Sequence, residues 1–298
     1  MSEFGRREFL ATLGALTAAF RLKAEATGST QSHIKLGYAA ITWGGDDPQA
    51  IADVSAVGFK GIQLRASAVD RWGTKPAELR ALLKSTGIAF PVLSSGNLKY
   101  QPEDVASQID LHLSHAKFVR DAGGEMLQVI DEKPKDRAVT RDDYARLADM
   151  LNTLGEKTKT VGVPLVYHHH MNSTGEPPAA IEAIMSNASA NAVGLLFDIA
   201  HYQQGGGDPV AAIRRYRNAI KVVHLKDVRP IDAAPGYQWV ELGRGRVDVK
   251  GCVASLQAIG FDGWAIVELD KVVDPNGTPK ASAETNRAFV VNQLGLSL

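Results

Sequence analysis

The chain has 298 residues, 45% of them hydrophobic and 28 of them glycine, which is enough to bury a full core and close to the size of one barrel domain. Its 33 basic and 33 acidic residues cancel, so the balance disfavours a nucleic acid or a membrane surface as partner and favours a small, weakly charged substrate. The single cysteine, Cys252, excludes an internal disulfide and a thiolate cluster, so nitrogen and oxygen must hold any metal.

The first thirty residues resemble an export signal. Arg6 and Arg7 precede an apolar run of small residues over 11–20, and Ala24-Glu25-Ala26 forms a small-x-small cleavage site. This order predicts a cleavable twin-arginine-type signal peptide over 1–26 and a periplasmic or secreted protein. The run is shorter than the roughly 20 residues that cross a bilayer, so we expect no membrane anchor after cleavage. The alternative is an amphipathic helix packed on the fold.

From residue 33 onward, short β-rich runs alternate with longer amphipathic ones. The predicted strands cover residues 34–41, 61–65, 89–94, 126–131, 164–168, 194–198, 221–225 and 264–269. Helical runs such as 106–122 and 144–160 place apolar residues on one face. This alternation predicts a single-domain (β/α)8 TIM barrel over 33–298. An open doubly wound sheet is disfavoured, because no glycine-rich dinucleotide fingerprint follows the first strand. The long segment 227–247 is expected to form an active-site loop.

Polar side chains end four successive predicted strands. A barrel places its catalytic groups at these ends, and the residues found there are Tyr167-His168-His169-His170, Asp198-Ile199-Ala200-His201, His224-Leu225-Lys226-Asp227 and Glu268-Leu269-Asp270. A single histidine in such a place is often a structural hydrogen-bonding residue. Imidazoles and carboxylates that converge from four strands instead predict one divalent metal, which the sequence leaves open as Mn, Co, Zn or Mg.

Short motifs at the same strand ends extend this pattern. They are an Asp-x-x-His element at 197–201, a His-x-x-Asp element at 223–227, a Gly-x-Gly-x-x-Asp loop at 242–248 and a last strand at 263–268. With these motifs the chain resembles the xylose-isomerase-like barrel superfamily of sugar isomerases, epimerases and dehydratases. Residues 167–171 and 37–43 are most similar to inosose dehydratase and its relatives.

The resemblance implies which residues hold the metal. Carried over by motif, the ligands are His168, Asp198, His224 and Glu268. His168 stands where the epimerases have a glutamate that also serves as one of two opposed acid-base groups, so the resemblance does not imply two-base epimerisation. Gln63 stands where the dehydratases tend to have glutamate.

The chemistry shared by the superfamily is proton abstraction next to a carbonyl, with a metal to stabilise the charge that develops. We expect His170 or His201 to be the acid-base group, since an imidazole titrates near neutral pH. The predicted function is a divalent-metal-dependent lyase that dehydrates a keto-inositol or eliminates from a 3-keto-glycoside. The alternatives are a metal-dependent keto-sugar isomerase or epimerase and a sugar-binding protein without turnover.

Six further residues are predicted to contact substrate: Trp43, Gln63, Lys226, Arg229, Arg244 and Arg246. Trp43 would stack on an apolar sugar face, and a buried structural tryptophan is the alternative. For the charged residues the alternative is a solvated place on the rim. A nuclease resembling endonuclease IV would need more metal ligands and a basic surface, and the neutral charge balance opposes it. The sequence does not indicate an oligomeric state.

Overall fold

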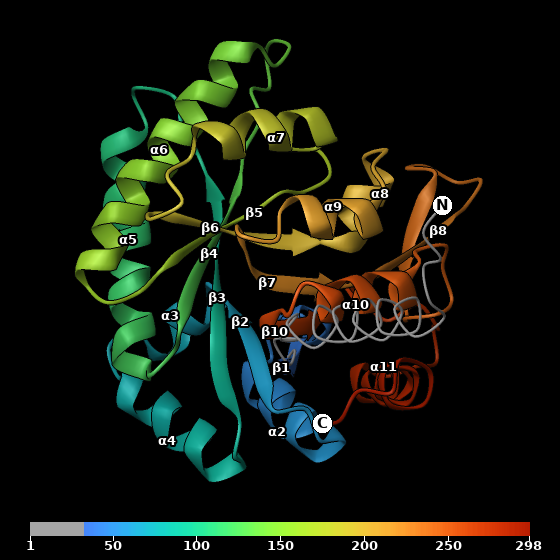
Figure 1. The fold of residues 1–298 in the computed structure, drawn as a ribbon. Helices are drawn as coiled ribbons and strands as arrows, with labels where there is room; N and C mark the ends of the chain where they lie inside the picture. The colour runs from blue at the N-terminus through green and yellow to red at the C-terminus, as the bar shows by residue number, and fades with distance from the viewer. Residues whose placement is uncertain (1–32) are drawn as a thin grey trace, which may run out of the picture.

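The computed structural model describes residues 33–298, and within them eight parallel strands close into a barrel surrounded by helices (Figure 1). The strands neighbour one another in the order β1-β10-β7-β6-β5-β4-β3-β2. The barrel predicted from the alternating pattern is therefore confirmed. The signal peptide predicted over 1–26 lies outside the described residues and stays a prediction.

The barrel strands are β1 (His33–Ala39), β2 (Gly61–Arg65), β3 (Ala89–Leu98), β4 (Met126–Asp131), β5 (Leu165–His168), β6 (Val193–Asp198), β7 (Ile220–Leu225) and β10 (Asp262–Val267). The first strand is shorter than predicted, because Ala40–Trp43 forms a 3-10 turn (η1) that ends at Gly44 in the left-handed region, φ 64°. The third is longer than predicted and contains a register shift between Ser94 and Asn97.

The helices lie outside the strands (Figure 1). They are α2 (Asp47–Val57), α3 (Ser67–Trp72), α4 (Pro76–Thr86), α5 (Val105–Ala122), α6 (Arg141–Thr160), α7 (Pro178–Asn187), α8 (Ile199–Gln204), α9 (Pro209–Arg215), α10 (Val249–Ala258) and α11 (Pro279–Leu294). Three of them, α2, α4 and α11, start with proline in the first turn and end at Gly58, Gly87 and Gly295 with positive φ, the signals that begin and end helices without strain.

The hydrophobic core has two parts. The larger fills the space between the strands and the helices. A separate cluster lies inside the barrel and consists of Ala39, Val92, Val166, Leu196, Val222, Trp264 and Ile266. Because strand side chains alternate between faces, the residues two positions beyond Val166, Leu196, Val222 and Ile266 also point inward, and they are His168, Asp198, His224 and Glu268. The apolar cluster thus lies inside the barrel directly beneath the polar residues that end the strands.

The predicted active-site loop over 227–247 contains an antiparallel hairpin, β8 (Asp227–Pro230) with β9 (Tyr237–Val240). Its base is fixed by the buried Asp227 carboxylate, which accepts hydrogen bonds from the backbone N–H groups of Gly243, Gly245 and Val247 at 2.9–3.0 Å. A Cβ on Gly245 would clash with Asp227 Oδ1. The glycine motif of this loop therefore supplies the backbone N–H groups that bind the carboxylate of Asp227.

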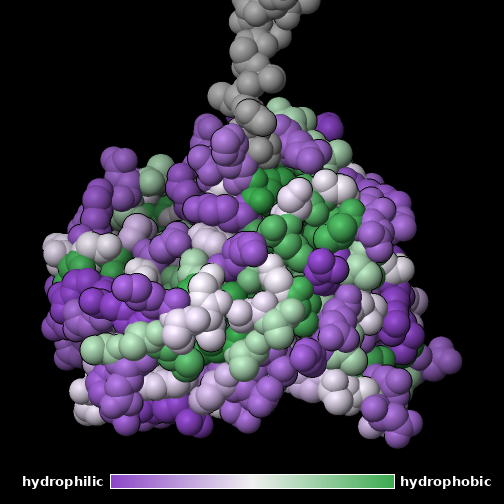
Figure 2. All heavy atoms as spheres, turned by 90° about the horizontal axis from the view of Figure 1, so that it is seen from below, coloured by the Kyte–Doolittle hydropathy of each residue, from purple (hydrophilic) through white to green (hydrophobic). Residues whose placement is uncertain are grey.

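On the face that Figure 2 shows, the surface is mainly hydrophilic, with hydrophobic patches between polar residues. Leu111 is the one large hydrophobic residue with an exposed side chain in the range 33–298. Within that range, no helix combines the length and the apolar character needed to cross a membrane.

Candidate metal centre and active site

Three of the buried polar atoms that have no hydrogen-bond partner among the described residues lie close together at the strand ends: His168 Nε2, Asp198 Oδ2 and His224 Nδ1. Asp198 Oδ2 lies 3.6 Å from His168 Nε2 and 3.4 Å from His224 Nδ1. His224 Nδ1 lies 3.5 Å from Glu268 Oε2. Ligands about 2.1 Å from a tetrahedral zinc stand roughly 3.4 Å apart, so these atoms are spaced like the ligands of one divalent ion. Buried polar atoms normally find a partner, and a cation among them would supply it.

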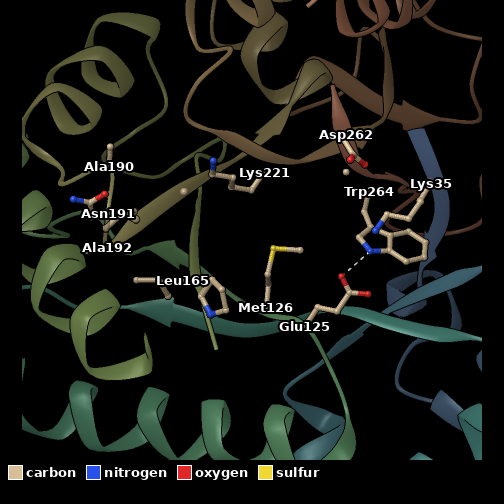
Figure 3. Close-up of a pocket in the computed structure, with 14 residues that line it drawn as sticks. Lys35, Glu125, Met126, Leu165, Ala190, Asn191, Ala192, Lys221, Asp262 and Trp264 are labelled. Carbon is tan, nitrogen blue, oxygen red and sulfur yellow. Dashed lines mark hydrogen bonds between the residues drawn. The ribbon is translucent and has the colours of Figure 1, made fainter. Parts of the chain in front are cut away.

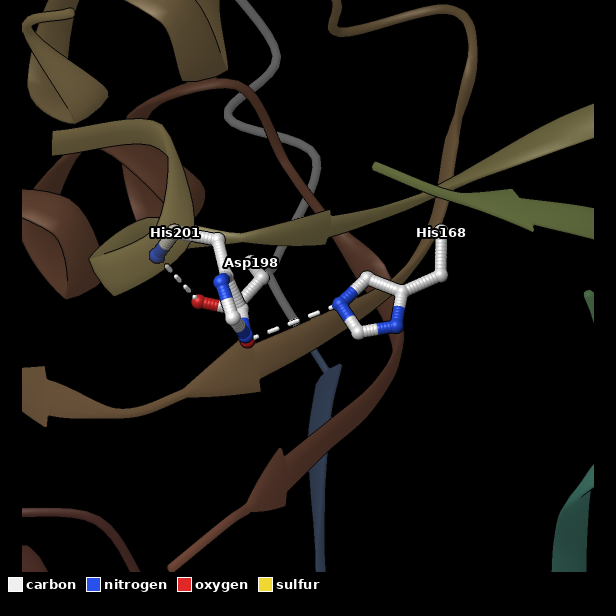
Figure 4. Close-up of side chains that lie close together, drawn as sticks. All are labelled: His168, Asp198 and His201. Atoms are coloured by element: carbon white, nitrogen blue, oxygen red, sulfur yellow. Dashed lines mark hydrogen bonds and ion pairs between the residues drawn. The ribbon is translucent and has the colours of Figure 1, made fainter. Parts of the chain in front are cut away.

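Local structure explains why Asp198 and His201 meet at this point. Asp198 ends β6 and is the N-cap of α8, where its Oδ1 accepts from the backbone N–H groups of Ala200 and His201 at 2.8 Å. The cap leaves Oδ2 free, 3.9 Å from His201 Nε2. Figure 4 shows the side chains of His168 and His201 next to this carboxylate.

The electrostatics of the site suit a cation. Burial lowers the pKa of His168 to about 4 and that of His201 well below its ordinary value, so these imidazoles are neutral at pH 7, as metal binding requires. Burial alone would raise the pKa of Glu268, but His224 and Lys226 outweigh it and hold it at about 2. Glu268 is therefore a carboxylate at all physiological pH values.

Lys226 lies inside the site. Its side chain is fully buried, and its Nζ lies 2.8 Å from Glu268 Oε1 and 2.5 Å from Asp270 Oδ1. Burial alone would lower the pKa of Lys226, but the Asp270 and Glu268 carboxylates raise it above its ordinary value. The hairpin covers this cation, since Nζ lies 4.6 Å from the centre of the Trp239 ring. Lys226 is thus a fixed positive charge at one edge of the candidate metal site.

The two histidines predicted as acid-base groups differ in whether a ring nitrogen is free. His170 Nδ1 lies 2.7 Å from the carbonyl oxygen of Met171, so Nδ1 donates and Nε2 keeps its lone pair. His201 has no free nitrogen, because Nδ1 accepts the Met171 N–H at 3.1 Å and Nε2 lies 3.3 Å from the Lys226 ammonium, which can only donate. The rings are 3.8 Å apart. The geometry therefore favours His170 as the base.

A cavity of about 260 Å³ opens beside these groups. Its lining includes Gln63, Arg65, His168, His170, Glu268 and Asp270. Pockets for drug-sized ligands span about 300 to 1,000 Å³, so this cavity suits one sugar or cyclitol ring. His169 is not part of it, because its ring points between strand and helix, where Nε2 accepts the Asp198 N–H at 3.2 Å and Phe197 packs nearby.

The structure does not bring four of the predicted substrate contacts to this cavity. The Trp43 indole N–H donates to Asp53 Oδ2 at 2.9 Å, which fixes the ring beside α2. Each of the three arginines forms a hydrogen bond with a neighbour on the rim. The pairs are Arg229 with Gln238, Arg244 with Glu241 and Arg246 with Gln204. Of the other two predicted contacts, Gln63 lies in the cavity wall and Lys226 is held by carboxylates.

Sequence reasoning missed Gln128 and Arg65 as members of the site, and it placed Asp270 at a strand end without giving it a role. Gln128 is buried in β4 and donates to His168 Nδ1 at 3.0 Å. Its signal was a single amide inside the apolar run Leu127-Gln128-Val129, because buried polar residues need a partner. Arg65 carries no such signal, since a charged residue at the end of a strand is usually solvated.

A second hollow of about 340 Å³ lies at the opposite end of the barrel (Figure 3). It is lined by the first residues of several strands, and there the Trp264 indole N–H donates to Glu125 Oε2 at 3.0 Å while Lys35 Nζ lies 5.0 Å from the Trp264 ring centre. Catalytic groups of these barrels gather at the other end of the strands. Trp264 instead closes the bottom of the barrel.

The fold is a closed (β/α)8 barrel, and buried imidazoles and carboxylates lie at the C-terminal ends of β5, β6, β7 and β10. These two features place the chain in the class of TIM-barrel proteins with a candidate metal centre. Within that class, the family described as Xylose isomerase-like TIM barrel matches residues 51–290, and the chain belongs to this family. The resemblance inferred from the strand-end motifs is confirmed.

Relatives and solved structures agree with this family. An inosose dehydratase of Lacticaseibacillus casei is 28% identical over 278 residues, which cover 80% of this chain and 90% of the relative. The crystal structure of a protein named IolI, which holds a zinc atom, matches with a TM-score of 0.76 at 16% identity, over 89% of this chain and 100% of IolI. An L-ribulose 3-epimerase matches with a TM-score of 0.73 at 20% identity, over 88% and 95% of the two chains. The prediction of an enzyme in the sugar lyase or isomerase/epimerase class is confirmed.

Proposed function

We propose that the protein is a divalent-metal-dependent lyase that removes water from a keto-inositol. The observation that carries the proposal is the buried set of His168 Nε2, Asp198 Oδ2 and His224 Nδ1, three atoms that have no hydrogen-bond partner in residues 33–298 and face one point beside Glu268. The relatives named inosose dehydratase support the substrate class. The cavity suits a single ring.

The residues of this chain divide the work of such a reaction. Asp198, His224 and Glu268 would hold the metal, with His168 facing the same point. The bound ion would stabilise the negative charge that develops on the substrate oxygens when the proton next to the carbonyl leaves. His170 Nε2 accepts that proton, because Met171 fixes the tautomer that leaves this nitrogen free.

Elimination then needs a proton for the departing β-hydroxyl. The electron pair left on carbon forms the new double bond, the C–O bond breaks, and the proton that His170 took up returns to the hydroxyl as it leaves as water. Lys226 keeps Glu268 ionised throughout, since its Nζ is 2.8 Å from Oε1. The Trp239 ring covers Lys226 and excludes water from this side of the site.

A lyase fits the site better than a two-base epimerase. Two-base epimerisation needs acid-base groups on opposite faces of the substrate carbon. In this structure the free imidazole nitrogen of His170 lies at the end of β5, and Gln63 of β2 presents a neutral amide, which cannot act as a base, to the same cavity. An isomerase that returns the proton with the same base remains the alternative.

The test is product analysis with the purified protein. After chelation, the chain is reloaded separately with Mn, Co, Zn and Mg and incubated with a keto-inositol or a 3-keto-glycoside, and the products are weighed by mass spectrometry. Loss of one water from the keto-inositol supports the proposal. Release of an aglycone would move the substrate to 3-keto-glycosides, and turnover without change of mass would replace the lyase by an isomerase or epimerase. Saturable binding with no product under any metal would identify a sugar-binding protein.

A further inference from the structure

Two glutamine amides connect the two histidines that face the candidate metal site. His224 Nε2 lies 2.8 Å from Gln63 Oε1, Gln63 Nε2 lies 2.9 Å from Gln128 Oε1, and Gln128 Nε2 lies 3.0 Å from His168 Nδ1. All four side chains are buried. We call His168, Gln128, Gln63 and His224 the amide relay.

The relay has a direction. A neutral imidazole carries one N–H and one lone pair, and an amide has a donor end and an acceptor end. Read from His224, each group donates to the next: His224 Nε2–H to Gln63, Gln63 to Gln128, and Gln128 to His168 Nδ1. The inner nitrogen of His224, Nδ1, therefore has a lone pair for a metal. The inner nitrogen of His168, Nε2, instead carries the proton.

Turning both glutamine amides round does not remove this difference between the inner nitrogens of the two histidines. The reversed relay protonates His224 Nδ1 and frees His168 Nε2, so one inner nitrogen is again a donor. Both histidines can bind a metal only if both outer nitrogens donate to amide oxygens. The two amide NH₂ groups would then face each other across 2.9 Å, and neither would have an acceptor. With Gln63 in an unbroken relay, only one of the two histidines, His168 or His224, can therefore bind a metal through its inner nitrogen.

His201 indicates which direction is used. The reversed relay would pair His168 with Asp198 and His201, whereas the direction described pairs His224 with Asp198 and Glu268. His201 Nδ1 accepts the Met171 N–H, and Nε2, the atom that faces Asp198, lies 3.3 Å from the Lys226 ammonium, which can only donate. Whether Nε2 carries the ring proton or accepts from Lys226, it has no lone pair left for a metal. The first set would thus contain a blocked ligand, and the second contains none.

We propose that the amide relay, with Gln63 as its positioning residue, makes His224 a metal ligand and His168 an N–H donor toward Asp198. This proposal deepens the metal-dependent function proposed above and rests on it. The metal would then be held by Asp198, His224 and Glu268, and His168 Nε2–H would face Asp198 Oδ2, 3.6 Å away.

Gln63→Glu tests the relay because a carboxylate has two acceptor ends. The introduced carboxylate would accept from His224 Nε2 and from Gln128 Nε2 at once, which leaves Gln128 Oε1 free to turn toward His168 Nδ1–H. Both inner nitrogens then have lone pairs, and His168 becomes an additional ligand. Residues that hold a metal-bound histidine change metal affinity by about 10- to 100-fold. We expect Gln63→Glu to tighten metal binding by at least about tenfold.

The experiment is a double-mutant cycle on the metal-free full chain. Affinity for Co is measured by its visible absorption in the wild type, His168→Ala, His224→Ala, Gln63→Glu and the Gln63→Glu, His168→Ala double variant. In the wild type, His224→Ala should weaken binding by about 100-fold or more and His168→Ala by less than about tenfold. The gain from Gln63→Glu should vanish in the double variant. A gain that survives without His168 would be plain charge attraction and would overturn the proposal, as would equal losses from the two histidine variants.

A second readout does not depend on metal or turnover. Nitrogen-15 NMR of the metal-free protein should find both His168 and His224 protonated on Nε2, and Gln63→Glu should move the His168 proton to Nδ1. His168 with its proton on Nδ1 in the wild type would refute the relay direction. If Gln63→Glu does not fold, Gln128→Glu offers the same two acceptor ends. These outcomes are independent of the lyase assay, so a failure there does not count against the relay.

Discussion

Asp198→Asn separates the two tasks of one carboxylate. Asp198 Oδ1 caps α8 by accepting two backbone N–H groups at 2.8 Å, and Oδ2 faces the histidines without a hydrogen-bond partner in residues 33–298. Asparagine caps a helix about as well as aspartate, so the cap should survive. Its NH₂ group replaces the free oxygen with a donor, which cannot bind a cation. We therefore expect a folded protein that does not bind metal.

The magnitudes follow from these contacts. Without metal, Asp198→Ala should lower the free energy of unfolding by about 1 kcal/mol more than Asp198→Asn, since only alanine removes the cap. With free metal at about 100 times Kd, binding should stabilise the wild type by about 2.7 kcal/mol. Neither variant should gain this increment.

The assay is urea unfolding of the three proteins with a chelator and with added Zn or Mn. Metal stabilisation of Asp198→Asn equal to that of the wild type would refute the metal role of Oδ2. Loss of stability in Asp198→Asn as large as in Asp198→Ala would refute the division of labour between the two oxygens.

Three further predictions concern other parts of the chain. His170→Ala should lower turnover by about 100-fold or more with unchanged metal affinity, and a loss below about tenfold in steady-state rates would argue against a base role. Burial, and then His115, lower the pKa of His112 from 6.5 to about 4. As the pH falls from 6.5 to 4, the unfolded chain therefore takes up this proton before the folded chain does. Across that window, His112 should lower the free energy of unfolding by about 3 kcal/mol. His112→Asn should flatten the fall in urea titrations, and an unchanged slope would contradict the assignment. A Cβ on Gly61 would lie 2.5 Å from the Trp264 ring, so Gly61→Ala should destabilise the fold by about 1 to 3 kcal/mol in thermal unfolding.

The barrel and its inward polar layer were predictable because both follow from local periodicity. Alternation of side chains along a strand places Val166 and His168 on one face, and the closed barrel makes that face the interior. No long-range contact had to be known. The hairpin β8–β9 was predicted only as a loop, because its strands of four residues are too short to show a period.

The directions of long charged side chains were not predictable. Lys226 and Arg229 both follow β7, three residues apart, yet Lys226 is fully buried among carboxylates and Arg229 bonds Gln238 on the rim. What separates them is the position of Glu268 and Asp270, more than forty residues later. A flexible cation goes to the nearest buried anion, and sequence spacing does not show where that anion lies.

The amide relay shows why the same limit applies to metal ligands. Gln63 and His224 are 161 positions apart and meet only because the inside of the barrel is narrow. A motif that places a histidine at a strand end predicts an imidazole at the site, but the lone pair that a metal needs depends on the partner of the other ring nitrogen. At position 63, glutamine and glutamate have nearly the same size and differ in one donor. That single difference decides, through two hydrogen bonds, whether His168 acts as a ligand or as a donor.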